Sequence, residues 1–117
     1  MLRFGLHMEF APQHSEETAA VLRALVGPVR SEPGCCTTRF LRDDDGTRMT
    51  WIEEWRSIED FEQRLKSPTF LRILAVIDHA VAPPLVDIDD VAWRRGFDLI
   101  EEILSQTRKT DRLSGRA

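Results

Sequence analysis

Apolar and polar side chains alternate along the first ten residues, which is the period-two pattern of a β-strand that buries one face. The apolar parity holds Phe4, Leu6, Met8 and Phe10. Pro12 ends this strand, and apolar residues then recur at helical spacing. The pattern predicts a helix from about Ser15 to Gly27, with the Ser15 hydroxyl as its N-cap.

The middle of the chain has the pattern of a β-hairpin. A Pro-Gly turn precedes residues 35–42, which are rich in β-forming side chains, and Asp45-Gly46 then suits a tight turn into residues 47–55. On this third strand one parity is more apolar, and we expect it to face the helices. Its members are Met49, Trp51, Glu53 and Trp55.

Two helix starts follow in close succession. Ser57 with Asp60 three residues later resembles a capping box, and Ser67-Pro68 is an N-cap followed by proline at the first helical position. The second helix ends before Pro83-Pro84. A last strand is expected within residues 85–93, followed by a C-terminal helix over residues 96–105.

The predicted order is βαββαβ plus a helix, and a hairpin at the centre of this order specifies an antiparallel four-stranded sheet with two helices on one face. The fold class is therefore α+β and ferredoxin-like. We expect one domain over residues 1–105, with residues 106–117 as a polar, flexible tail. The other face of the sheet would stay wet in a monomer, which predicts a homodimer.

Composition and charge exclude several classes of partner. The chain has 117 residues, 42% of them hydrophobic, and a formal net charge of −4. An acidic protein lacks the clustered Lys and Arg that bind nucleic acid, and no apolar run approaches the roughly 20 residues that span a bilayer. We therefore expect a cytoplasmic protein with neither nucleic-acid nor membrane partners.

Cys35 and Cys36 are adjacent and are the only cysteines in the chain. Neighbours on a strand point to opposite faces, so a bond between them would need a strained turn. We expect them to begin the second strand, with one thiol turned inward. The three histidines have no metal-ligand spacing, so no metal site is predicted.

The turn "EPGC", the strand-to-helix junction "EEWRSIEDF" and the helix break "LKSPTF" together resemble the antibiotic biosynthesis monooxygenase (ABM) family, over roughly residues 3–92. The resemblance implies a dimeric α+β barrel whose subunits each hold an apolar pocket between helices and sheet. It also implies an oxygenase that needs no metal, flavin or haem. Its substrate would be a small aromatic, a quinol or a polyketide-like molecule.

Such chemistry needs one base in an apolar pocket, because a deprotonated phenol, quinol or anthrone can reduce dioxygen directly. Two candidates are Glu53, a carboxylate among aromatic side chains, and His79, near the end of a helix that borders the cleft. Glu53 could instead pair with Arg39, and His79 could simply favour the helix dipole.

Five apolar residues are candidates to shape the pocket, although each could equally be core. They are Met8, Trp51, Trp55, Phe61 and Phe70. Three other functions stay open: a non-catalytic or stress-related module that binds a small apolar ligand, a cyclase or isomerase, and haem degradation. The haem-degrading branch of the family uses an asparagine, a tryptophan and a histidine. This chain has Met8, Arg64, and Leu74 or Val76 in those places.

Overall fold

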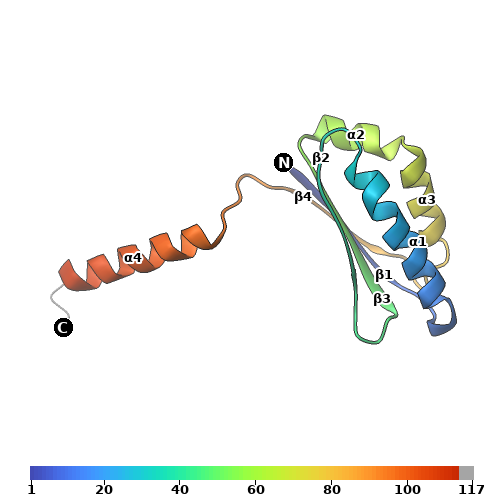
Figure 1. Ribbon diagram of the computed structural model, residues 1–117, viewed down its shortest axis with the longest axis horizontal. Coiled ribbons are helices and arrows are strands. Elements are labelled where there is room, and N and C mark those ends of the chain that lie inside the picture. The colour runs from blue at the N-terminus through green and yellow to red at the C-terminus, as the bar shows by residue number, and fades with distance from the viewer. Residues whose placement is uncertain (114–117) are drawn as a thin grey trace.

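The computed structural model describes residues 1–113 and contains a single four-stranded antiparallel sheet. Its elements in chain order are β1 (Leu2–Glu9), α1 (Pro12–Arg30), β2 (Cys35–Arg42), β3 (Arg48–Trp55), α2 (Ile58–Leu65), α3 (Pro68–Ile77), β4 (Leu85–Asp90) and α4 (Phe97–Leu113). The strand order is β2-β3-β1-β4, which confirms the predicted ferredoxin-like fold. Helices α1, α2 and α3 cover one face of the sheet, and α4 stands apart on the other side (Figure 1).

The hydrophobic core lies between the sheet and helices α1 to α3. The predicted apolar parity of β1 faces the helices, and in β3 Met49, Trp51 and Trp55 are all at most 1% exposed. The opposite parity of the sheet carries mostly exposed side chains. This second face, which we call the outer face, has no helix packed on it (Figure 1).

Two predicted helix caps are confirmed. The Ser57 hydroxyl accepts a hydrogen bond from the backbone N–H of Asp60 at the start of α2, and the Ser67 hydroxyl accepts one from the N–H of Phe70 at the start of α3. Each cap satisfies a backbone donor that has no partner inside the helix. The two caps turn the chain sharply twice within ten residues and place α3 beside α1.

The predicted start of α1 is wrong. The helix begins at Pro12 with Ala11 as N-cap, because proline at the first helical position has the required φ and lacks only an N–H that would be unpaired. The Ser15 hydroxyl instead donates to the carbonyl of Pro12 inside the first turn. The extra turn brings His14 into the helix.

Helix α4 is longer than predicted, because it runs through residues 106–113. This segment has no glycine or proline before Leu113 and contains Gln, Arg and Lys, which are good helix formers, so nothing in it ends the helix. The expected boundary at residue 106 is therefore wrong, and residues 114–117 of the predicted tail lie outside the described residues.

Candidate active site

Glu53 lies in the core with its side chain fully buried. Its Oε1 accepts from the indole Nε1 of Trp55 at 2.9 Å and from Nε of Arg64 at 3.0 Å. Its Oε2 accepts from Nε1 of Trp51 at 2.7 Å and from Nη2 of Arg64 at 2.9 Å. Four donors occupy the two oxygens, so the carboxylate has no free acceptor site for a substrate proton.

Arg64 of α2 provides the charge that balances Glu53. Its side chain is fully buried too, and beyond Glu53 its Nη1 donates to the hydroxyls of Ser67 and Thr69, at 2.8 and 2.5 Å. Glu32 lies 3.4 Å from its Nε. A buried ion pair persists only when both partners are fully hydrogen-bonded, as they are here. This geometry argues for a structural role of Glu53, whose expected alternative partner, Arg39, is exposed on β2.

The five residues expected to shape a substrate pocket belong to the packed core. Trp51 and Trp55 are fully buried, and Met8 and Phe61 are at most 5% exposed. The ring of Phe4 lies between Phe61 and Phe70, with centroid distances of 5.3 and 6.3 Å. These side chains fill the space between helices and sheet where the pocket was expected. Trp55 also borders a small cavity of about 270 Å³ beside Arg64.

A larger cavity of about 590 Å³ lies between α1 and α3. Its lining residues are His14, Glu17, Thr18 and Val21 from α1, and Arg72, Ala75, Val76 and His79 from α3 and the turn after it. Thr18 and Val76 are buried, whereas the other lining residues are mostly exposed. The cavity therefore has a buried floor and a polar rim.

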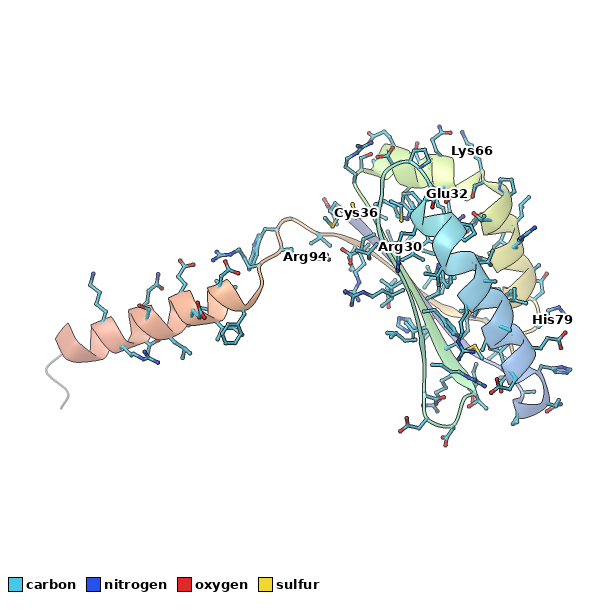
Figure 2. All side chains as sticks on the ribbon, in the orientation of Figure 1. Arg30, Glu32, Cys36, Lys66, His79 and Arg94 are labelled. Atoms are coloured by element: carbon cyan, nitrogen blue, oxygen red, sulfur yellow. The ribbon has the colours of Figure 1, made fainter. Side chains whose placement is uncertain are left out.

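Of the two predicted catalytic residues, Glu53 and His79, it is His79 that borders the cavity between α1 and α3. It follows α3 directly, where its backbone N–H donates to the carbonyl of Val76 at 3.0 Å. Figure 2 shows it at the end of α3 beside the first turns of α1. The ring nitrogen of a neutral imidazole can take a proton from a bound substrate.

His14 and Arg72 are site residues that the sequence reasoning missed. His14, Thr18 and Val21 are spaced i, i+4, i+7, and Arg72, Ala75, Val76 and His79 are spaced i, i+3, i+4, i+7, so each set shares one helix face. This spacing can be read from the sequence. Which helix lies beside which depends on the tertiary fold, so the spacing alone does not bring the two sets together. Within the described residues Arg72 has no ion-pair partner, so its guanidinium can bind an anionic group.

The cysteines begin β2, as predicted, at a register shift opposite the end of β3. The Cys35 Sγ lies 3.2 Å from the Thr38 hydroxyl, and burial raises the pKa of this thiol. Cys36 is exposed. Both thiols are free, so they fit a structural role at the strand start.

Residues 1–113 contain no group of three His, Cys, Asp or Glu side chains placed to hold a metal ion. Over the same range, each helix is too short or too polar to cross a bilayer.

The fold and the cavity define a ferredoxin-like α+β domain with an imidazole-bearing cavity between two helices. The family model described as antibiotic biosynthesis monooxygenase matches residues 1–76. The chain belongs to this family. Among curated proteins none matches the chain.

Solved structures share the fold of this chain. Rv0793 from Mycobacterium tuberculosis is 22% identical with a TM-score of 0.73, over 81% of this chain and 98% of that one. A structure described as an antibiotic biosynthesis monooxygenase is 22% identical with a TM-score of 0.71, over 80% of this chain and 100% of that one. PA3566 from Pseudomonas aeruginosa is 30% identical with a TM-score of 0.65, over 81% and 94%.

Proposed function

We propose that the protein is a monooxygenase that oxidises a small aromatic, quinol or polyketide-like substrate in the cavity between α1 and α3. Membership of the family supports the reaction class. The observation that carries the site is the cavity itself, whose volume of about 590 Å³ is that of a typical small-molecule site and whose rim holds two imidazoles. His79 is the proposed base, and His14 lines the same cavity.

The reaction starts with a proton transfer to the imidazole. An acidic C–H or O–H of the substrate, such as the ring methylene of an anthrone, loses its proton to His79. The carbanion passes its electrons to dioxygen and forms a C–O bond, which gives a peroxide. Loss of water from the peroxide breaks the O–O bond and leaves a carbonyl, so that CH₂ and O₂ become C=O and H₂O. The substrate supplies all the electrons.

The protein has three tasks in this scheme. Val21, Ala75 and Val76 provide apolar walls that hold a flat ring and exclude water. The Arg72 guanidinium stabilises the negative charge that develops on the substrate oxygen. His79 accepts the proton. Glu53 takes no part, because its oxygens are occupied by Arg64 and the two indoles.

Oxygen consumption tests this proposal. The full chain should consume oxygen above the rate of autoxidation with menadiol, naphthoquinol or an anthrone, and His79→Gln should lower the rate roughly 10²–10⁴-fold, the usual contribution of a general base. His7→Gln is the matched control, since His7 lies on the outer face and bonds Asp87. No consumption above background across the panel would favour the second candidate, a module that binds an apolar ligand without reaction.

The proposal includes a homodimer formed through the outer face. Unpaired charges on this face are arranged with opposite signs at its two edges, because Arg39 lies on β2 and Asp89 on β4. A twofold axis through the face would place the β2 edge of one subunit against the β4 edge of the other. Arg39 would then meet Asp89 of the second copy.

A cytoplasmic location stays a prediction.

A further inference from the structure

Helix α4 exposes an apolar side to solvent in the single chain. It stands clear of the rest of the molecule (Figure 1), and four of its apolar side chains are about half exposed or more. They are Phe97 at 68%, Ile100 at 49%, Ile103 at 51% and Leu104 at 49%. An amphipathic helix of this length gains most of its stability from packing that side on another surface. The arrangement indicates a missing partner surface.

The segment that leads into α4 is held on the outer face of the sheet. The N–H of Val91 donates to the carbonyl of Met1 at 2.7 Å, and Arg94 forms an ion pair with Glu54 of β3. Glu54 is only 5% exposed although it points to the outer face. Figure 2 shows Arg94 at the start of the segment that leaves the sheet. These anchors direct α4 away from helices α1 to α3 of its own chain.

The same chain has an uncovered apolar strip on the other face, at the β4 edge. Val86 and Ile88 pair with Leu6 and Phe4 of β1, so they point to the helix side, yet they remain 51% and 56% exposed. Leu74 of α3 is 42% exposed and lies roughly 200° around the helix from Arg72, on the flank away from α1. We call Leu74, Val86 and Ile88 the β4 strip.

Charges around α4 and the β4 strip are complementary. Arg95 forms ion pairs with Asp98 and Glu102 in the acidic first half of α4 and balances part of its negative charge. Arg108 and Lys109 in its second half have no such partner within the described residues. Two acidic residues flank the β4 strip: Asp78 follows α3, and Asp90 ends β4, where its Oδ1 lies 3.9 Å from the N-terminal amine of Met1. Helix α4 thus has exposed apolar side chains in its first half and basic side chains in its second half. The β4 strip is apolar and has acidic residues beside it.

We propose that α4 packs on the β4 strip of a second copy of this chain, and that the second copy's α4 packs reciprocally on the first. Both surfaces are present on one chain, so a twofold pair satisfies both at once. Because the outer face is where a second copy would lie, a helix anchored there reaches that copy first. The inference rests on the proposed homodimer but not on the oxygenase reaction.

Disulfide trapping tests this arrangement directly. In a full-length Cys35→Ser, Cys36→Ser background, chains with Ile100→Cys are mixed with chains with Ile88→Cys and oxidised mildly. The expected result is a covalent heterodimer that contains one of each chain. Ile58→Cys is the matched control in place of Ile88→Cys, since Ile58 is 55% exposed but lies on α2.

Three outcomes would overturn the proposal. One is the absence of a heterodimer while sedimentation still shows a dimer, which would leave the sheet-face dimer standing without the exchange of α4. A second is an intramolecular bond when both cysteines are on one chain, which would mean that α4 folds back on its own β4 strip. A monomer in sedimentation would remove the homodimer and the exchange together.

A charge reversal gives a second, independent measurement. Arg108→Glu with Lys109→Glu should raise the dimer dissociation constant about tenfold at low salt, and the difference should shrink as salt is added. Arg23→Glu is the control, because Arg23 is exposed on α1 and stacks on Phe40. Equal dissociation constants for the two variants would contradict the proposed contact.

Discussion

Glu53 accepts hydrogen bonds from three side chains in the core, those of Trp51, Trp55 and Arg64. Its two oxygens accept four bonds, and its only compensating charge is Arg64. Breaking a buried ion pair by removing one charge is costly because the other charge stays buried without a partner. Glu53 therefore contributes mainly to the stability of the fold. The alternation of side chains along β3 places it on the face of the sheet that the helices cover.

Glu53→Gln should lower the free energy of unfolding by about 1–3 kcal/mol, because the new NH₂ group faces N–H donors in the core, while Glu32, 3.4 Å from Nε of Arg64, still balances the charge of Arg64. Urea unfolding followed by circular dichroism measures this. Glu62→Gln, at an exposed position of α2, should change it by at most about 0.5 kcal/mol. If Glu53→Gln unfolded at the wild-type midpoint yet lost oxygen uptake, Glu53 would be a catalytic base instead.

The two cysteines should differ in reactivity with iodoacetamide. Cys36 is exposed and should react first, whereas burial raises the pKa of Cys35 and keeps its thiol protonated to higher pH. Mass spectrometry of Cys35→Ser and Cys36→Ser separates the two rates. The folded state holds the Cys35 proton more tightly than the unfolded state does. The resulting contribution to the free energy of unfolding is complete below the pKa that Cys35 has in the unfolded state, and it is lost as the pH rises through the pKa that Cys35 has in the folded state. Equal rates at both sites would refute the burial of Cys35.

At the scale of elements, the turn into β2 depends on Gly34. Its φ is +82°, and a Cβ there would lie 2.3 Å from the Asp60 carboxylate. The same carboxylate accepts hydrogen bonds from Ser57 and Arg56 at the start of α2. The turn and the helix start are thus packed against each other, and side-chain atoms at position 34 would separate them.

Two glycine-to-alanine substitutions should have opposite effects. Gly34→Ala should destabilise the fold by about 1 kcal/mol or more, because alanine is strained in the left-handed conformation that Gly34 adopts. Gly27→Ala should stabilise it by up to about 1 kcal/mol, because that position is inside α1 and a Cβ there meets nothing within 4 Å. Thermal unfolding of both variants measures the pair. A Gly34→Ala protein as stable as wild type would contradict the turn geometry.

Most elements could be predicted from local pattern, whereas the site could not. Alternation placed Trp51 and Glu53 on the inner face, and serine caps located the starts of α2 and α3. The pairing of Glu53 with Arg64 depends on how α2 packs over β3, which no local pattern contains. For the same reason the pocket was expected among core aromatics, although its best candidate lies between α1 and α3 and is lined by His79 and His14.

At the scale of the whole molecule, we expect the outer face to be buried against the outer face of a second copy in a dimer. Sedimentation velocity should give a particle of twice the 13.5 kDa chain mass. Leu41 points to this face and is 52% exposed, so Leu41→Asp should shift the population to monomer. Ile58→Asp changes an equally exposed residue on α2 and should leave the dimer intact. A monomeric wild-type protein at micromolar concentration would contradict the dimer.

The central claim is that the cavity between α1 and α3 binds an aromatic substrate, and the three histidines of the chain report on it. His14 and His79 line the cavity, whereas His7 lies on the outer face of β1. Titration of the Cys35→Ser, Cys36→Ser protein, which lacks thiols that would add to the quinone, with menadione and NMR of the imidazole C–H groups should shift the signals of His14 and His79 and leave that of His7 in place. Saturable binding that leaves both cavity histidines unmoved would contradict the claim.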